Sequence, residues 1–118
     1  MADTRLSGTR GFRVECYELD ETLVAECHGK LTFENTPALK DAVRDKIGVH
    51  KRIVLDMKEV PLVDSSGLGS IVGLYVSART RGCDLQVANA SDQIRNLFSM
   101  TNLLSLFEHA GRHHGKTI

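Results

Sequence analysis

The sequence predicts an α/β fold in which helices stack against one β-sheet. Two observations carry this prediction. A pair of strand-like segments near the N-terminus is followed by segments in the order helix, strand, helix, strand, helix, a pattern that favours right-handed crossovers between mainly parallel strands. In addition, the 118 residues are 42% hydrophobic and 25% charged, which fits one globular domain with a sizeable core. We see no internal repeat and expect one domain over residues 12–110.

Both ends of the chain are expected to lie outside that domain. Residues 1–11 are small and polar with two glycines, and residues 111–118 form a polar tail, so both are predicted to be flexible. The N-terminal residues lack the apolar stretch of a secretion signal, and no apolar run approaches the roughly 18 residues that a membrane helix needs. A cytoplasmic location without a membrane partner is therefore expected.

The charge balance argues against a nucleic-acid partner. Lys plus Arg and Asp plus Glu number 15 each, which gives a formal net charge of zero. Direct binding of nucleic acid needs a basic footprint, which this composition does not supply. The five histidines are scattered along the chain, so no metal site and no cofactor are predicted.

A β-hairpin is predicted at the start of the domain. Residues 12–19 and 22–28 show alternating apolar positions, and Asp20-Glu21 between them suits a two-residue turn. That turn places Cys16 opposite Ala25, so a disulfide between Cys16 and Cys27 is not expected and both are assigned to the core. With Cys83 the chain has three cysteines, an odd number that fits reduced thiols in the cytoplasm.

Three helices and two further strands complete the prediction. The first helix is expected to have Thr36 as its cap and Pro37 in its first turn, and to end at Gly48. The second runs to Arg79, and the third begins after Ser91. Residues 52–57 are typical of a strand covered on both faces, and residues 84–88 form another strand. The apolar positions expected to face inward include Ala38, Leu39, Ala42, Val43, Ile47, Leu68, Ile71, Val72, Tyr75, Val76, Ile94, Leu97, Phe98 and Met100.

The segment V-D-S-S-G-L-G at residues 63–69 is the candidate functional site. A serine-hydrolase nucleophile elbow would need Gly two residues before the serine, but Asp64 stands two residues before Ser66. The glycine spacing matches neither of the phosphate-binding loop patterns, and close packing of the helix on the sheet explains Gly69 and Gly73 better. Neither an active serine nor a nucleotide loop is predicted.

Two readings of the segment remain open together. Asp64, Ser65 or Ser66 is expected to cap the second helix by accepting hydrogen bonds from free backbone N–H groups. One cap does not explain two adjacent hydroxyls. A serine at a helix start also suits phosphorylation, because the positive end of the helix dipole tolerates the added ~1.5–2 negative charges.

The sequence resembles a known family over residues 12–110. The stretch V-L-D-M-K-E-V-P-L-V-D-S-S-G-L-G-S-I-V-G at residues 54–73 is similar to the central signature of STAS domains, specifically bacterial anti-sigma factor antagonists. The H-G-K-L turn at residues 28–31 and N-L-F-S-M-T-N-L at residues 96–103 extend the resemblance. It implies a mixed sheet of four or five strands with helices packed mainly on one face.

The resemblance also implies a non-enzymatic regulator that works by partner switching. Its partners would be an anti-sigma factor serine kinase of the histidine-kinase-like ATPase fold and a PP2C-type phosphatase. The implied phosphorylation site is Ser65, with Ser66 as the second choice. The interaction face is expected to combine the loop 62–69, the start of the following helix and residues 30–36. The expected partner-binding residues are Asp64, Ser65, Ser66, Gly67, Leu68, Thr32, Phe33 and Glu34. A STAS scaffold or assembly subunit that is not phosphorylated, as in stressosome-like or lipid-transport assemblies, is the alternative.

One segment departs from the family pattern. Many antagonists carry acidic residues in a G-E-L-D-like segment after the second strand, whereas this chain has Gly29-Lys30-Leu31-Thr32. Lys30 reverses the charge and Thr32 replaces a carboxylate. The partner surface or the kinase interaction is therefore expected to differ here.

Overall fold

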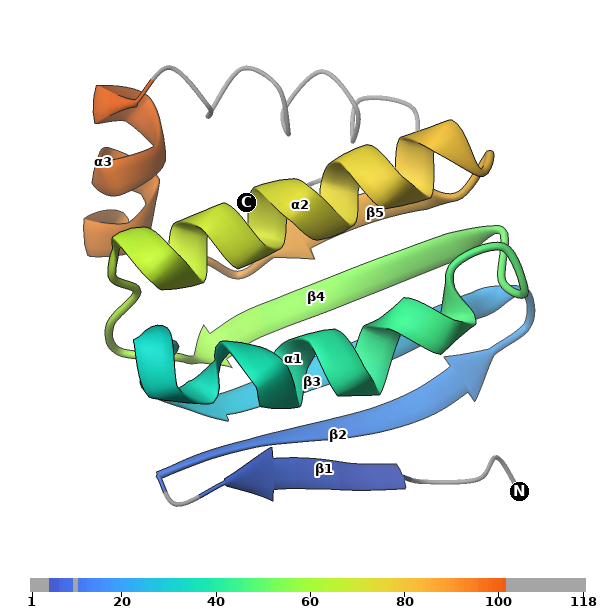
Figure 1. Ribbon diagram of the computed structural model, residues 1–118, viewed down its shortest axis with the longest axis horizontal. Helices are drawn as coiled ribbons and strands as arrows, with labels where there is room; N and C mark the ends of the chain where they lie inside the picture. Colours follow the sequence, from blue (N-terminus) through green and yellow to red (C-terminus); the bar gives the residue numbers. More distant parts are fainter. Residues whose placement is uncertain (1–4, 10, 102–118) are drawn as a thin grey trace.

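The computed structural model describes residues 5–9 and 11–101 as a mixed five-stranded sheet with helices against it (Figure 1). The strands follow the order β1-β2-β3-β4-β5; β1, β2 and β3 pair antiparallel, whereas β4 pairs parallel to both β3 and β5. They are β1 (Arg5–Thr9), β2 (Phe12–Leu19), β3 (Thr22–Gly29), β4 (Arg52–Glu59) and β5 (Asp84–Ala88). The α/β class and the mixed sheet are confirmed.

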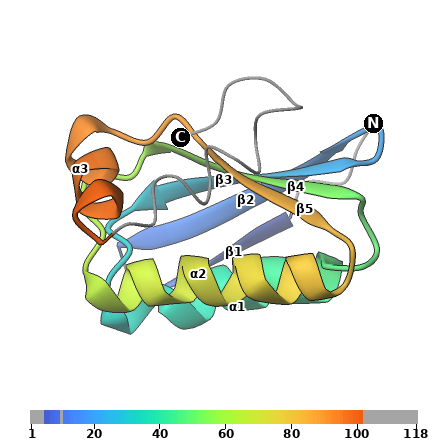
Figure 2. The ribbon, with the colours of Figure 1, turned by 90° about the horizontal axis from the view of Figure 1, so that it is seen from above.

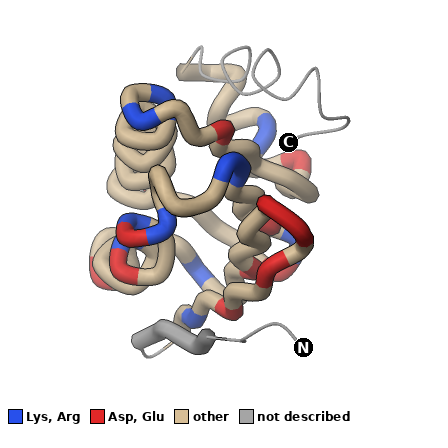
Figure 3. The backbone as a smooth tube through the Cα atoms, turned by 90° about the vertical axis from the view of Figure 1, so that its right-hand side faces the viewer, with Lys and Arg blue, Asp and Glu red and all other residues tan. Residues whose placement is uncertain are grey.

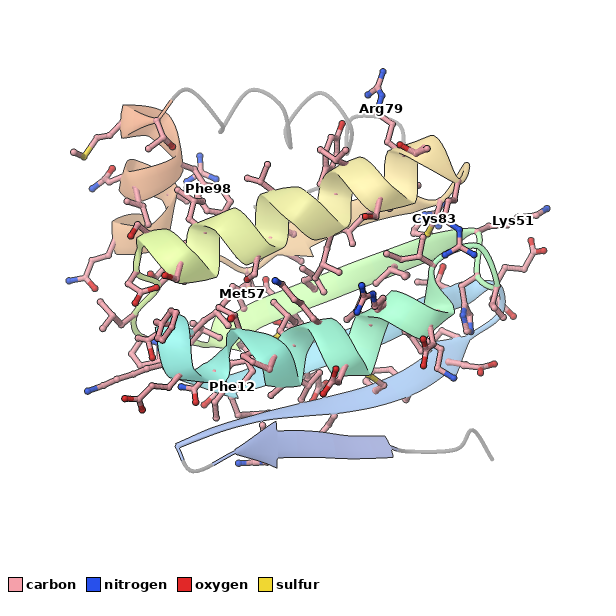
Figure 4. All side chains as sticks on the ribbon, viewed as in Figure 1. Phe12, Lys51, Met57, Arg79, Cys83 and Phe98 are labelled. Atoms are coloured by element: carbon pink, nitrogen blue, oxygen red, sulfur yellow. The ribbon has the colours of Figure 1, made fainter. Side chains whose placement is uncertain are left out.

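The helices α1 (Thr36–Val43) and α2 (Ser65–Thr80) lie side by side on one face of the sheet, and α3 (Asp92–Met100) lies at one end (Figure 2). Between them and the sheet lies the core, in which Phe12, Met57 and Phe98 are at most 2% exposed (Figure 4). Within the described residues, no helix is both long enough and apolar enough to span a bilayer.

The predicted hairpin and its register are confirmed. β2 and β3 are joined by Asp20 and Glu21, and Asp20 adopts a φ of 56°. Cys16 pairs with Ala25 as expected, and both Cys16 and Cys27 are free, buried thiols. Burial, followed by the nearby Cys16 thiol and a carboxylate, raises the pKa of Cys27 to about 12, so this thiol stays protonated and inert in the folded protein.

The N-terminal segment differs from the prediction. Residues 5–9, expected to be flexible, form the edge strand β1, which pairs with β2 from Thr9 opposite Phe12 to Arg5 opposite Cys16. Gly11, with a φ of 82°, makes the tight reversal between the two strands. The backbone of β2 therefore has hydrogen-bonding partners on both sides, which the alternating apolar side chains of β2 do not reveal.

The first helix is shorter than predicted and has a different cap. Asn35, not Thr36, is the N-cap residue, although its side chain makes no capping hydrogen bond. The helix gives way to a 3-10 turn at Arg44–Lys46, so Gly48 (φ 90°) lies beyond it. Pro37 lies in the first turn as expected, because its fixed φ suits a helix start.

The strand β4 is covered on one face only by these helices. Ile53, Leu55 and Met57 are fully buried, whereas Arg52, Val54 and Asp56 on the other face are intermediate in exposure. The prediction of a strand buried on both faces is therefore wrong for β4. The sequence of β4 carries apolar residues on both faces, because Val54 stands between Ile53 and Leu55, and this made the two faces look alike.

Two inward assignments are also wrong. Val76 is 55% exposed on α2, and Met100 is 81% exposed at the end of α3. Gly69 and Gly73 do not pack against the sheet either, since both are exposed and a Cβ on either would meet nothing within 4 Å. The predicted domain residues 102–110 and the predicted tail 111–118 lie outside the described residues.

The end of the domain beyond the C-terminus of α2 carries charges of both signs. Figure 3 looks onto this end and shows Lys/Arg and Asp/Glu positions close together. Lys51 Nζ lies 3.3 Å from Glu21 Oε1, and both Lys51 and Arg79 point away from the ribbon in Figure 4. Mixed charge of this kind fits a net charge of zero.

Candidate functional site

Asp64 caps the helix that carries the serines. Its backbone is extended (φ −92°, ψ −176°), and its carboxylate Oδ1 accepts a hydrogen bond from Gly67 N at 2.8 Å. The Asp64 carbonyl accepts from Leu68 N at 2.9 Å, which closes the first helical turn. Of the three capping candidates in the sequence, the structure selects the aspartate, so neither serine hydroxyl is needed as the cap.

The three serines in the first two turns of α2 lie in different surroundings. Ser65, the first helical residue, is exposed, and Ser66 is half-buried. Ser70 is buried, and its hydroxyl donates to the Gly67 carbonyl at 2.7 Å. Among these three, Ser65 offers the hydroxyl that another protein reaches most easily.

A second loop is held against the serine loop by backbone hydrogen bonds. Leu31 N donates to Leu62 O at 2.9 Å, and Asp64 N donates to Leu31 O at 3.2 Å, so the two segments pair like a short parallel bridge. The Asp64 carboxylate adds a third contact, because its Oδ2 accepts from Phe33 N at 3.1 Å. One carboxylate therefore caps α2 and fixes the position of Phe33.

Gly67 is required where the two loops meet. A Cβ built at this position would collide with the Leu31 carbonyl oxygen and would lie 3.0 Å from Leu31 Cγ. Leu31 itself is fully buried. The glycine after the two serines therefore allows the backbones to approach closely, and its role is packing.

The residues predicted to bind a partner divide into exposed and buried groups. Phe33 is 73% exposed, Glu34 is also exposed, and Thr32 is half-buried. Gly67 and Leu68 are buried, so this side of the helix packs against the protein interior and is not open to a partner. The structure thus brings residues 32–34 beside residues 64–66 and leaves Phe33 and Ser65 open to solvent.

Two exposed apolar residues lie near this site, one in the expected interaction loop 62–69 and one that the sequence assigned to the core. Leu62 is 46% exposed directly before the serine loop, and Met100 is 81% exposed on α3. Both line one shallow groove between residues 61–63 and α3. The starts of α1 and α2 and the helix α3 all lie at this end of the domain (Figure 1). Met100 looked like an ordinary core position in the sequence, so no local signal marked its exposure.

The comparisons with known proteins place this chain in a family. The family model for the STAS domain matches residues 13–116. The chain belongs to the STAS domain family. A similar curated protein, the anti-sigma-B factor antagonist of Listeria monocytogenes, is 35% identical over 83 residues, which cover 68% of this chain and 71% of the relative.

Solved structures show the same fold. An anti-sigma factor antagonist from Mycobacterium paratuberculosis is similar with a TM-score of 0.74 and 20% identity, covering 86% of each chain. The Bacillus anti-sigma factor antagonist SpoIIAA is similar in its unphosphorylated form, with a TM-score of 0.62 and 19% identity over 83% of each chain. Its phosphorylated form has a TM-score of 0.66 and 20% identity, covering 80% of this chain and 86% of that one.

The departure from the family pattern lies at the edge of this site. In this STAS domain Lys30 is exposed, and its carbonyl accepts a hydrogen bond from Asn35 Nδ2 at 2.7 Å. Thr32 is the residue that precedes the 3-10 turn at Phe33–Asn35, and its carbonyl accepts from Asn35 N at 2.8 Å. The loop therefore keeps an ordered backbone while it presents the Lys30 side chain to solvent.

Replacing Asp64 by alanine is expected to lower the free energy of unfolding by about 1–2 kcal/mol, because the helix loses its cap and Phe33 N loses its acceptor. Asp64→Asn is the matched control, since an amide oxygen still caps the helix and most of the stability should remain. Urea unfolding followed by circular dichroism measures both. An Asp64→Ala protein as stable as the Asp64→Asn protein would contradict the assigned cap.

Proposed function

We propose that this STAS domain is an anti-sigma factor antagonist that works by partner switching in the cytoplasm. Unmodified, it binds an anti-sigma factor serine kinase of the histidine-kinase-like ATPase fold and so releases a sigma factor. The kinase phosphorylates Ser65, the complex separates, and a PP2C-type phosphatase restores the free hydroxyl. The protein itself acts as a substrate and ligand, not as an enzyme. The observation that carries the proposal is the exposed Ser65 hydroxyl at the first position of α2, beside the aspartate that caps the helix.

A phosphate on Ser65 is compatible with the folded domain. The added charge of about −1.5 to −2 would stand at the positive end of a 16-residue helix, where free N–H groups and the dipole favour an anion. The Asp64 carboxylate is the opposing influence, because it bears a like charge on the neighbouring residue. Since Asp64 also holds Phe33 N, its repulsion by the phosphate would disturb Phe33 together with the serine.

The surface around Ser65 has the composition of a protein-binding site. Phe33 and Leu62 offer apolar side chains from the two paired loops, and Ser65 and Glu34 provide a polar margin. Large aromatic side chains at the centre of an interface carry much of the binding energy. A phosphate placed among such contacts would lose its hydration without gaining an opposite charge from the partner. This cost would weaken the binding of the kinase strongly.

Co-purification identifies the partner, and a direct binding measurement tests it. The tagged chain should retain an ATP-binding anti-sigma factor from its host, and the two purified proteins should form a complex by calorimetry. Adding ATP should dissociate this complex for the natural protein and leave it intact for Ser65→Ala. A stable complex that ignores both ATP and changes at Ser65 would instead support the scaffold or assembly-subunit alternative.

Phe33→Ala is expected to weaken kinase binding at least about tenfold, which corresponds to about 1.4 kcal/mol, without lowering stability. The matched control is Val76→Ala, because Val76 is also an exposed apolar residue. Val76 lies 11 residues after Ser65 on α2, which is roughly 16 Å along the helix. Calorimetric titration of both variants with the kinase measures the difference. Equal losses for the two variants would remove Phe33 from the proposed interface.

A further inference from the structure

Two glutamates and a histidine meet on the sheet face opposite α1 and α2. Glu15 of β2 pairs directly with Glu26 of β3, and His28 lies two residues further on the same side of β3. The alternate residues face the helices; the Cys16 thiol, for example, lies 3.9 Å from a carbonyl oxygen of α1. Like charges directly opposite each other in a sheet destabilise the pair, so this arrangement favours a cation between them.

Neighbouring groups orient these carboxylates without cancelling their charge. Arg13 Nη2 lies 3.1 Å from Glu15 Oε1, and Arg13 Nε donates to the same oxygen at 3.2 Å. The Tyr17 hydroxyl donates a hydrogen bond to Glu26. Among the described residues, one guanidinium therefore stands against two carboxylates.

A third carboxylate continues the row on β4. Asp56 pairs with Glu26, and its Oδ1 accepts hydrogen bonds from Asn89 Nδ2 at 3.1 Å and Lys58 N at 3.0 Å. These donors are uncharged. The side chains of Lys58 and Glu59 line the same hollow, and their opposite charges offset each other. The local excess of negative charge therefore remains.

The distances at His28 match metal coordination better than hydrogen bonding. His28 Nε2 lies 3.5 Å from Glu15 Oε1 and 3.7 Å from Glu26 Oε1, beyond the roughly 2.7–3.2 Å of a hydrogen bond. This nitrogen is buried and has no hydrogen-bond partner among the described residues. Ligands at about 2.0–2.2 Å from a tetrahedral ion stand about 3.3–3.6 Å apart, close to both distances.

We propose that Glu15, Glu26 and His28 bind one divalent transition-metal ion, with Zn²⁺ as the probe. Two carboxylate oxygens and one imidazole nitrogen supply three ligands within 4.8 Å of one another, and water completes the coordination. The imidazole favours Zn²⁺ over Mg²⁺ and Ca²⁺. Arg13 and Tyr17 act as the second layer that fixes the two carboxylates. The ion would tie β2 to β3 on the face away from Ser65.

Calorimetry of the full chain tests the site. His109, His113 and His114 are first changed to glutamine, so that these three imidazoles offer Zn²⁺ no competing ligands. After chelator treatment this protein should bind one Zn²⁺. Glu26→Gln should lower the Zn²⁺ affinity at least about tenfold, because the loss of a group that only hydrogen-bonds to a ligand already costs about that much. Glu18→Gln is the matched control, because Glu18 pairs with another histidine at 3.3 Å, and it should leave the affinity within about twofold.

Imidazole nitrogen NMR of the same protein locates the ion without relying on a variant. Zn²⁺ should shift the ring nitrogens of His28 and leave those of His50 unchanged, and Mg²⁺ at the same concentration should shift neither. The proposal is overturned if Zn²⁺ at millimolar concentration does not bind. It is equally overturned if Glu26→Gln binds as tightly as its parent, or if His50 responds in place of His28.

Discussion

Replacing Ser65 by aspartate is expected to weaken binding of the anti-sigma factor kinase by at least about thirtyfold. A single misplaced charge in a protein interface costs about 2 kcal/mol or more, and 1.4 kcal/mol is a factor of ten in affinity. A phosphate, with nearly twice the charge, is expected to cost up to about 5 kcal/mol, or several thousandfold. The exposed position of Ser65 at the start of α2 means that this loss arises at the interface and not from unfolding.

The controls for this prediction lie on the same helix. Ser65→Ala should bind the kinase as the natural protein does and resist modification. Ser66→Ala should both bind and be modified, since Ser66 is half-buried whereas Ser65 is exposed. Calorimetry gives the affinities, and urea unfolding confirms that the Ser65→Asp domain is as stable as its parent. If Ser65→Asp binds with undiminished affinity, the hydroxyl lies outside the interface.

Gly67→Ala is expected to lower the free energy of unfolding by about 1–3 kcal/mol, the range seen when extra atoms are forced into a packed site. The added methyl group would collide with the Leu31 carbonyl, whose hydrogen bond to Asp64 N joins the two loops. The loss is expected in spite of the helix propensity of alanine, which by itself favours the change by roughly 0.5–1 kcal/mol.

Gly69→Ala, two residues along the same helix, is the matched comparison and should have the opposite sign. Nothing lies within 4 Å of a Cβ at this position, so the propensity gain of roughly 0.5–1 kcal/mol should appear undiminished. Urea unfolding of both variants, with unchanged m-values, tests the pair. A Gly67→Ala protein that is stabilised like Gly69→Ala would mean that the two loops do not approach as described.

Local patterns predicted most of the elements because local physics determines them. The two-residue turn fixed the hairpin register, so Cys16 opposite Ala25 followed directly. The Ser91 cap was also predictable, since its hydroxyl accepts from Ile94 N within one turn. Strand β1 was not, because R-L-S-G-T has no alternating apolar pattern, and only pairing with β2 makes it a strand.

The sequence predicted which kind of residue forms the site, but not the hydrogen bonds that join its two loops. The sequence pointed to a serine at a helix start, yet it left three residues as candidate caps. The choice of Asp64 depends on its simultaneous contact with Phe33, 31 residues earlier in the chain. The exposure of Met100 was missed for a similar reason, because it is decided by how α3 packs and not by its own neighbours in sequence.

Mapping the phosphate tests the proposed switch most directly. The chain is incubated with the co-purified kinase and ATP, digested, and examined by mass spectrometry beside Ser65→Ala and Ser66→Ala. We expect one phosphate on Ser65 in the natural protein and in Ser66→Ala, and none in Ser65→Ala. A phosphate on another residue, or no phosphate from a kinase that is active and bound, would contradict the switch.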